Sequence, residues 1–344
     1  MHVFFFEHVI GGGEAPDEPP AALARQGKAM LRAVAADFLK IGWQITTTCD
    51  ARQTLDLNGA TVIPIHDTDA LRTTFERQRQ SADAALIIAP ESEGQLFKWT
   101  RALFNVSLDA NPAVARNASI KNLGSDLDAI ALCADKLALA RHLQAFGVPT
   151  PPTALHPDNV TRPAVIKPRY GAGCESTFYV EDATRNACSD DEELVYQPWV
   201  KGTAASASLV VNAHGIVPLQ AGEQTIEQRG QRLYYTGGRL PLNDAETQRA
   251  MRLAEAAARA IPGLRGFVGI DLVLGESAGE DQVIEINPRI TMSYPALSAL
   301  STTPLARTIL DSTDPPHWYD GTYTFTADGT IHWDAYPSAC ALNP

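Results

Sequence analysis

The chain has 344 residues, of which 45% are hydrophobic and 20% are charged. This length is enough for two or three domains with buried cores, and the composition is ordinary for a globular protein. The formal net charge of -12 argues against nucleic acid as a partner, because phosphate backbones are bound by clustered lysines and arginines. Small molecules or other proteins are the expected partners.

The five cysteines are odd in number and show no C-x-x-C spacing, so they indicate neither a disulfide framework nor a zinc site. The N-terminal apolar run meets Glu7 too early for a signal peptide, and the chain has no run of about 18 apolar residues. We therefore expect a cytoplasmic protein without a membrane partner. The sequence does not set the oligomeric state, and a homodimer is compatible with it.

The first third of the chain alternates between strand-like and helical stretches. Strands are predicted at residues 2–9, 44–48, 60–65 and 84–89, and helices at residues 20–41, 68–79 and 94–104. This rhythm is typical of a parallel α/β sheet, and it predicts an N-terminal domain over residues 1–115.

Two loops of this domain could contact a ligand. Glycines at residues 11–13 let the backbone approach a ligand, although a flexible turn is an equal alternative because the G-x-G-x-x-G spacing is missing. Residues 90–94 place acids at the end of an apolar strand, where open α/β sheets bind ligands. Helix capping by Glu91 or Ser92 is the alternative there.

A second region begins with two helices, one over residues 126–133 and one opened by Asp135. A glycine and three prolines within residues 147–152 end the second helix, so a domain step is expected nearby. The strand at residues 162–168 carries Lys167 near its end and precedes a glycine-containing loop, residues 169–177. Backbone N–H groups and a lysine charge suit phosphate, whereas a glycine hairpin with a surface lysine is the alternative.

The strand at residues 193–200 is broken by Pro198, which leaves backbone groups available to read an adenine edge. A hairpin is predicted over residues 206–219, with its turn at residues 212–215. Residues 229–239 mix cations, aromatics and glycines and predict a loop suited to anions, or merely a polar loop. An amphipathic helix follows at residues 244–261.

Residues 266–274 and 282–289 predict a hairpin that joins three oxygen-bearing side chains. If Leu274 faces Gln282, then Asp271 faces Glu285, and strand parity puts Asn287 on the same face. Two opposed carboxylates among buried apolar residues need a cation, and this oxygen donor set suits Mg²⁺. A solvated hairpin face is the alternative.

Five motifs in this order resemble the ATP-grasp superfamily: Asp135-Lys136, then Ile166-Lys167-Pro168 with its glycine loop, then Tyr196-Gln197-Pro198-Trp199, then Asp271, then Glu285-Ile286-Asn287-Pro288. The resemblance implies an α/β fold in which an N-terminal domain precedes two lobes that clamp ATP. The expected divisions are residues 1–115, a small lobe at 116–200, a large lobe at 201–310 and a C-terminal tail at 311–344.

Shorter strings, at residues 6–13, 171–175 and 285–294, resemble the tyramine-glutamate ligase group, which serves methanofuran and methylofuran synthesis. The resemblance implies an ATP-dependent ligase that joins a carboxylate to an amine through an acylphosphate, with ATP, Mg²⁺ or alternatively Mn²⁺, and small amino-acid and amine substrates. Its implied catalytic and ATP-binding residues are Arg289, Lys136, Lys167, Gly171, Gly173, Gln197, Trp199 and Arg239. Its implied metal ligands are Asp271, Glu285 and Asn287, and its implied substrate contacts are Glu7, Gly12, Gly13, Glu91, Thr291, Ser293 and Tyr294.

One departure is that many relatives carry a ribose-binding glutamate near Ala204, where this chain has residues Thr203-Ala204-Ala205-Ser206. Two other functions stay open from the sequence, a general amino-acid or peptide ligase and a non-catalytic nucleotide-binding regulator. The complete acid set argues against the regulator. The tail contains a hairpin-like pattern at residues 323–333, whose role the sequence does not indicate.

Overall fold

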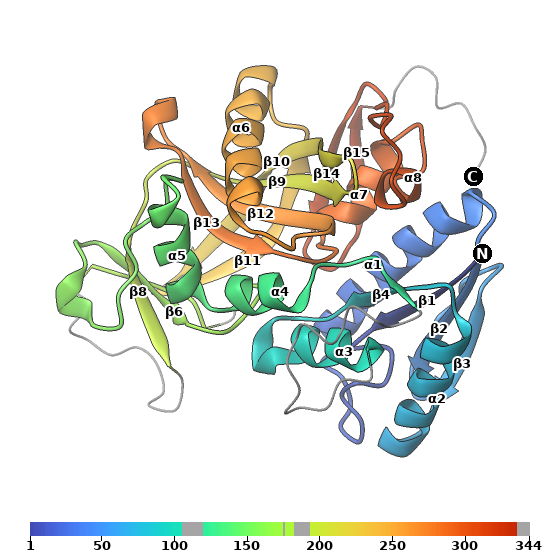
Figure 1. The fold of residues 1–344 in the computed structure, drawn as a ribbon. Helices are drawn as coiled ribbons and strands as arrows, with labels where there is room; N and C mark the ends of the chain where they lie inside the picture. Colours follow the sequence, from blue (N-terminus) through green and yellow to red (C-terminus); the bar gives the residue numbers. More distant parts are fainter. Residues whose placement is uncertain (105–119, 175, 182–192, 336–344) are drawn as a thin grey trace.

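The computed structural model describes residues 1–104, 120–174, 176–181 and 193–335. It contains a five-stranded sheet, in which all pairings are parallel, and a ten-stranded sheet, in which the pairings among described strands are antiparallel. Figure 1 shows the two sheets in neighbouring parts of the molecule, joined through α4. The predicted α/β fold with a separate N-terminal parallel sheet is confirmed.

The N-terminal sheet has the strand order β3-β2-β1-β4-β5. Its strands are β1 (His2–Glu7), β2 (Gln44–Asp50), β3 (Thr61–Ile65), β4 (Ala84–Ile88) and β5 (Lys121–Asn122), and its helices are α1 (Ala21–Lys40), α2 (Thr68–Ser81) and α3 (Gln95–Leu103). Successive side chains of β1 point to opposite faces. Val3 and Phe5 pack with α1, whereas Phe4 and Phe6 pack with α2 and α3. Burial of both faces explains why this strand is a continuous apolar run.

The fifth strand extends this sheet past the predicted boundary at residue 115. The boundary itself falls within residues 105–119, outside the described part of the chain.

The second sheet has the order β13-β12-β9-β10-β11-β7-β6-β8, with β14 paired to β11 and β15 to β14. Its strands are β6 (Ala164–Pro168), β7 (Phe178–Val180), β8 (Leu194–Pro198), β9 (Thr203–Asn212), β10 (Gly215–Arg229), β11 (Arg232–Leu240), β12 (Gly266–Leu274), β13 (Gln282–Asn287), β14 (Thr322–Thr326) and β15 (Ile331–Ala335). Helices α4 (Leu127–Ala134), α5 (Lys136–Ala145) and α6 (Asp244–Ala260) accompany it. Alternate β9 residues Ala205, Ala207 and Leu209 pack with α6 in one core, so the residues between them face the other side.

The loop predicted at residues 229–239 is wrong, because most of this stretch is strand β11. Only a tight turn separates β10 from β11, and Gly230 provides it with a positive φ of 63°. Leu233 is buried while Arg232 is exposed, so the mixture of cations and apolar residues reflects the two faces of a strand.

The hairpin of β12 and β13 is confirmed, and Asp271 lies opposite Glu285 as predicted. The predicted pairing of Leu274 with Gln282 is wrong, since Gln282 pairs with Val273. A register shift between Asp271 and Leu272 absorbs one residue on β13, as in a β-bulge. The two carboxylates therefore meet although the outer part of the hairpin is shifted.

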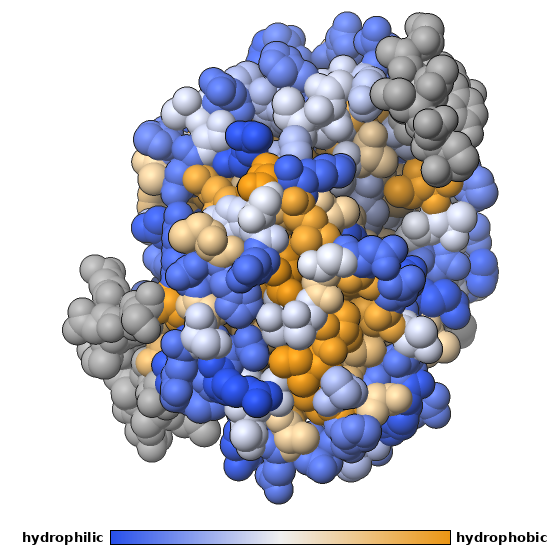
Figure 2. Space-filling model, turned by 90° about the vertical axis from the view of Figure 1, so that its right-hand side faces the viewer, coloured by the Kyte–Doolittle hydropathy of each residue, from blue (hydrophilic) through white to orange (hydrophobic). Residues whose placement is uncertain are grey.

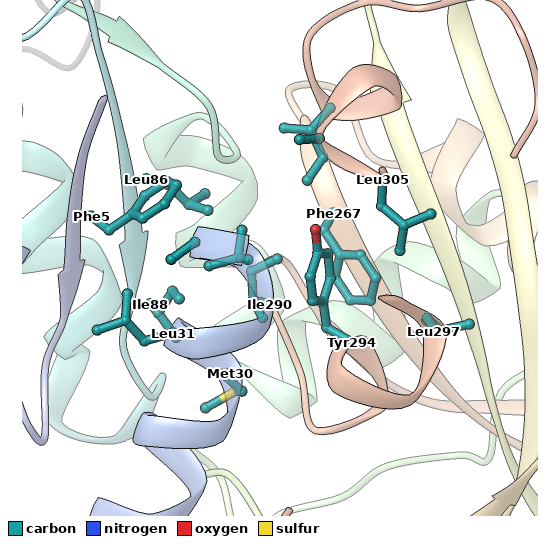
Figure 3. Close-up of a cluster of buried hydrophobic side chains, with 14 of the residues drawn as sticks. Phe5, Met30, Leu31, Leu86, Ile88, Phe267, Ile290, Tyr294, Leu297 and Leu305 are labelled. Atoms are coloured by element: carbon teal, nitrogen blue, oxygen red, sulfur yellow. The ribbon is translucent and has the colours of Figure 1, made fainter. Parts of the chain in front are cut away.

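The tail forms the predicted hairpin, but it belongs to the main sheet. Strand β14 pairs with β11, and helices α7 (Ser293–Leu300) and α8 (Ala306–Ile309) precede it. Helix α7 packs against α1, and one buried cluster contains residues of both sheets. Figure 3 shows Phe5, Leu86, Ile88 and Leu31 on one side of this cluster and Phe267, Tyr294, Leu297 and Leu305 on the other. The two domains thus share a core.

The rim of this shared core is not fully covered, since Leu39, Ile41, Trp43 and Leu57 remain partly exposed. Figure 2 shows an apolar band across the face on the N-terminal-domain side, surrounded by hydrophilic residues. Within the described residues, none of the helices has the length and apolar character needed to cross a membrane.

Candidate active site

A cavity of about 650 Å³ lies between the N-terminal sheet and the second sheet. On the N-terminal side it is lined by residues at the carboxyl ends of β1 and β4, including Glu7 and Ile88. Strand β1 lies between β2 and β4, so the strand order reverses here, which is where open parallel sheets bind ligands. The opposite wall comes from β9 to β13 and from the glycine loop after β6.

Asp271 and Glu285 lie side by side in this wall. Asp271 Oδ1 accepts a hydrogen bond from Gln224 Nε2 at 2.8 Å, and Oδ2 accepts one from Asn287 Nδ2 at 3.1 Å. Burial and, to a smaller extent, the charge of Glu285 raise the pKa of Asp271 to about 6, against the opposing effect of these hydrogen bonds. The predicted trio of Asp271, Glu285 and Asn287 is therefore brought together.

The chemistry of this donor set fits a magnesium ion. In the part of the chain that the structure describes, no group of three or more His, Cys, Asp and Glu residues converges as a metal site, and this trio offers two carboxylates and one amide. The pKa of Asp271 is raised chiefly by burial and also by the charge of Glu285, so a bound cation would help to keep both carboxylates ionised. Few oxygen ligands with room for phosphate oxygens suit Mg²⁺.

Two lysines face the same acids. Lys136 Nζ lies 3.8 Å from Glu285 Oε1 and donates to the carbonyl of Gly171 at 2.6 Å. Lys167 is 5% exposed, and its pKa is lowered by burial, with the charge of Glu285 acting in the opposite direction. Lys136 thus ties the glycine loop to the acid hairpin, and Lys167 places a charge at the end of β6 as predicted.

The glycine loop is anchored at its base by Arg169, which forms a two-point ion pair with Asp135. Gly171, Ala172, Gly173 and Cys174 line the cavity, while Glu175 lies outside the described residues. Burial raises the pKa of the Cys174 thiol to about 12, so this thiol stays protonated and is a poor nucleophile.

The predicted adenine-reading strand also lines the cavity, through Gln197 and Trp199. Gln197 is 4% exposed and donates from Nε2 to Thr153 Oγ1 at 2.8 Å. Trp199 is partly exposed, and its ring meets Tyr179 edge-on at 5.1 Å between centroids. Ala204 lines the cavity as well, and its methyl group cannot accept a hydrogen bond from ribose hydroxyls.

Arg289 extends from the loop after β13 to Glu91, which follows β4. Its Nε and Nη2 donate to the two Glu91 oxygens at 2.9 and 2.7 Å. The guanidinium also donates to the Ile290 carbonyl from Nη1 and weakly to Asn287 Oδ1 from Nη2. Glu91 is 3% exposed and does not line the cavity, so this carboxylate, predicted to contact substrate, is paired with Arg289 instead.

Glu7 lies in the part of the cavity wall that the N-terminal sheet contributes. Its Oε2 accepts a hydrogen bond from the Ile10 N–H at 2.7 Å, and Gly27 of α1 packs directly against the carboxyl group. Burial raises the pKa of Glu7 to about 7, although this hydrogen bond and the charge of Arg289 oppose the rise. Glu7 is therefore a buried carboxyl group poised to exchange a proton near neutral pH.

The glycines after β1 allow the tight backbone turn that follows Glu7, instead of contacting a ligand. The N–H groups of Gly11 and Gly13 donate to the Glu7 and His8 carbonyls at 2.8 and 2.9 Å, and any side chain on Gly13 would strike the His8 ring. Gly12 and Gly13 do not line the cavity, so the prediction that they contact substrate is wrong. Their small size lets the chain turn tightly around Glu7.

Thr291 and Ser293 line the cavity as predicted, and their hydroxyls lie 2.9 Å apart. The prediction that Tyr294 contacts substrate is wrong, because this residue is fully buried in the shared core and its hydroxyl donates a hydrogen bond to Asp37 at 3.0 Å. Arg239 is also wrong as a site residue, since its exposed side chain lies on the opposite face of β11 from the buried Gly238 and away from the cavity.

The sequence prediction missed several lining residues, among them His8, Ser206, Gln224, Tyr235, Met292 and Phe325. Strand parity identifies Ser206, because it lies directly opposite Asp271 in the ladder of β9 and β12. Phe325 carried no such signal, since its position depends on a strand pairing between distant parts of the chain.

Comparisons with known proteins agree with this geometry. Residues 43–130 match the family model described as a pre ATP-grasp 3 domain, and residues 133–293 match the model described as an ATP-grasp domain. A tyramine–L-glutamate ligase from Methanocaldococcus fervens is 28% identical over 294 residues, covering 84% of this chain and 87% of the relative.

Two solved structures are similar in fold. A putative ATP-grasp superfamily protein from Archaeoglobus fulgidus superposes with a TM-score of 0.72 and 24% identity, covering 95% of this chain and 92% of that one. An L-amino acid ligase from Bacillus licheniformis gives a TM-score of 0.65 at 15% identity, covering 94% and 78% of the respective chains.

Proposed function

The chain belongs to the ATP-grasp superfamily, and we propose that it is an ATP-dependent ligase that joins the side-chain carboxylate of glutamate to tyramine or a related aromatic amine. ADP and phosphate are the other products. The similarity to tyramine–L-glutamate ligase over most of both chains supports this choice, and it suggests a role in the synthesis of a methylofuran-type cofactor.

The observation that carries the proposal is the unequal character of the two ends of the cavity. One end holds Asp271, Glu285, Lys136 and Lys167, which suits the phosphates of ATP. The other end has the buried acid Glu7, and the cavity lining contributed by the N-terminal domain includes Leu23 and Met30 of α1 as well as Glu14, whose charge acts on Glu7. An amine with an apolar body matches the second end, because the carboxylate pairs with nitrogen and the apolar walls bury the ring.

At the phosphate end, we propose that Asp271, Glu285 and Asn287 hold Mg²⁺, with Mn²⁺ as an alternative. The bound ion would neutralise phosphate charge so that two anions can approach each other. Lys167 and Lys136 add positive charge from the protein itself. Gln197 and Trp199, at the end of β8 and just after it, would border the nucleotide base.

The reaction then needs positioning more than a protein nucleophile. A glutamate carboxylate oxygen forms a bond to the γ-phosphorus of ATP as the bond to ADP breaks. The amine nitrogen attacks the resulting carbonyl carbon, and phosphate leaves. Of the five N–H groups of Arg289, contacts with described residues use four, and we propose that the remaining Nη1 hydrogen faces the developing oxyanion.

The attacking amine must first lose a proton, because an ammonium has no free electron pair. Glu91 is occupied by Arg289, so Glu7 is the carboxylate that we propose accepts this proton. A pKa of about 7 lets Glu7 act as a base just above neutral pH. Thr291 and Ser293 offer hydroxyl groups to the polar end of the glutamate.

The test is an ADP-release assay with ATP, Mg²⁺, glutamate and a panel of amines, with mass spectrometry of the products. We expect a glutamyl amide with tyramine in clear preference to alanine or ammonia. Equal use of aliphatic amino acids as acceptors would favour a general amino-acid ligase. ATP binding without ADP release for any substrate pair would favour a non-catalytic regulator. We propose a cytoplasmic location for the enzyme, and its oligomeric state remains to be measured.

A further inference from the structure

The C-terminal hairpin of β14 and β15 forms part of the cavity wall. It lies beyond residue 293, where the ATP-grasp family match ends. Strand β14 pairs with β11 so that Phe325 lies opposite Gly238 and Tyr323 lies opposite Leu240. Phe325 is 5% exposed and lines the cavity, whereas Tyr323 is fully buried and does not.

A glycine in the floor of the sheet makes room for the Phe325 ring. A Cβ atom on Gly238 would lie 2.9 Å from Cζ of Phe325, closer than real contacts allow. On the neighbouring strand β10, a Cβ atom on Gly222 would lie 2.5 Å from Leu240 Cδ2. Gly238 thus leaves space for the Phe325 ring, whereas Gly222 leaves space for Leu240, which also lines the cavity.

The turn of the hairpin is fixed to the N-terminal domain. Gly329 has a φ of 86°, and a Cβ atom there would lie 2.4 Å from Ala29 Cβ and 3.3 Å from Met292 Cε. Asp328 lies 3.6 Å from Arg25 of α1 in an exposed ion pair. The hairpin therefore connects β11 to α1, and Phe325 is held at a defined position at the boundary of the two domains.

The residues that share this part of the wall are apolar. Leu23 and Met30 come from α1 and Met292 comes from the loop after β13; all three line the cavity and belong to the same packed cluster as Phe325. Figure 3 shows Met30 on α1, at the edge of the shared core. Together with Phe325 they form a surface of thioether, aliphatic and aromatic groups, which suits a planar apolar group.

We infer that Phe325 determines specificity by packing against the ring of the acceptor amine, an inference that rests on the proposed function. An edge-to-face or offset contact between two rings stabilises binding beyond the burial of apolar area. Replacing the ring by leucine keeps an apolar side chain but removes this contact. The tail is then a substrate-recognition element of the enzyme.

The experiment compares F325L with Y323L, a matched change two residues away on the same face of β14. Each full-length enzyme is assayed with glutamate and tyramine, and separately with hydroxylamine, a small nucleophile that traps activated glutamate as its hydroxamate. We expect F325L to raise the KM for tyramine about 10-fold, a ratio that corresponds to about 1.4 kcal/mol. Its hydroxamate formation and its KM for ATP should match the wild type.

Y323L should leave the KM for tyramine unchanged, even where its melting temperature falls. The inference is overturned if F325L changes both reactions equally, or if Y323L raises the tyramine KM as much as F325L does, because either result indicates a structural role. A wild-type enzyme that forms no glutamyl product even with hydroxylamine would instead refute the proposed function. A wild type that forms both products, with F325L unchanged in both, refutes the role of Phe325 alone.

Discussion

Replacing Glu7 by glutamine tests two claims: that this buried acid accepts a proton in the reaction, and that its burial lowers the free energy of unfolding. The variant keeps the size of the side chain and an oxygen that can accept the Ile10 N–H bond, but it cannot ionise. In the wild type, the pKa of Glu7 is raised to about 7 from an ordinary 4.5, chiefly by burial. The folded protein therefore binds a proton at Glu7 that the unfolded chain has already released between these two pH values.

The sign and size of the effect follow from this difference in proton binding. Stability falls as pH rises wherever the folded state holds more protons than the unfolded state. At about 1.4 kcal/mol for each tenfold change in proton affinity, the Glu7 carboxyl group lowers the free energy of unfolding by about 3 kcal/mol above pH 7. Below pH 4.5 the group is protonated in both states and contributes no such loss.

The assay is urea unfolding of the wild type and E7Q at several pH values between 4.5 and 8.5. Between pH 4.5 and 8.5, we expect the free energy of unfolding of the wild type to fall by about 3 kcal/mol relative to that of E7Q. A constant difference between the two proteins, caused by the amide itself, does not affect this change. In parallel, amide formation should fall strongly in E7Q. The wild-type rate should decline as pH falls through about 7, with no such decline attributable to residue 7 in the variant.

A stability difference that stays flat between pH 4.5 and 8.5 would refute the raised pKa. Full activity of E7Q together with an unchanged pH profile would refute the role of Glu7 as proton acceptor. A stability shift without any loss of activity would support the raised pKa of Glu7 and refute its role as proton acceptor.

Asp271→Asn and Glu285→Gln should each reduce turnover by at least about 100-fold with little loss of melting temperature, because they remove metal-binding charge and keep shape; near-normal turnover in both, measured as ADP release, contradicts the metal site. Lys167→Ala should weaken ATP binding by about 10- to 100-fold, as expected for a charge-assisted hydrogen bond of about 1.5–3 kcal/mol, and calorimetric titration should find glutamate binding less affected. Glu91→Gln should lower the free energy of unfolding by about 3–5 kcal/mol, because Arg289 is left buried without its partner; a loss below about 1 kcal/mol in urea unfolding would mean that the pair is solvated.

Local patterns in the sequence predicted the elements that depend on neighbouring residues. The apolar, β-branched pattern of β12 and β13 predicted the hairpin, and Asp271 lies opposite Glu285 as predicted. The assumed pairing near the turn was one residue off, and the irregularity between Asp271 and Leu272 compensates for that difference. Lys167 was predicted near phosphate because it ends an apolar strand before a glycine loop, and its burial in the cavity wall argues against the alternative of a surface lysine. The apolar run at residues 2–9 likewise predicted a strand, and strand β1 occupies His2–Glu7.

The errors share a physical cause, which is tertiary contact between distant segments. Tyr294 follows β13 in sequence, but helix α7 turns its ring into the core, where Asp37 of α1 accepts its hydrogen bond. Glu91 was predicted to meet substrate, yet Arg289, which lies 198 residues away in sequence, occupies it. Neither pairing can be read from local periodicity, because loop closure over such distances depends on the whole fold.

The same long-range contacts explain why the N-terminal domain is part of the site rather than an appendage. Glu7 belongs to β1, whereas the acids Asp271 and Glu285 belong to the second sheet, so the two ends of the cavity come from different domains. The buried Glu91–Arg289 pair and the core shared by α1 and α7 fix these domains against each other. A buried ion pair adds little net stability, but it requires one relative position, since breaking it leaves two uncompensated charges. The distance between Glu7 and the acids Asp271 and Glu285 is thereby set by packing, and in the proposed reaction, which brings an amine to a short-lived activated carboxylate, the rate depends on that distance.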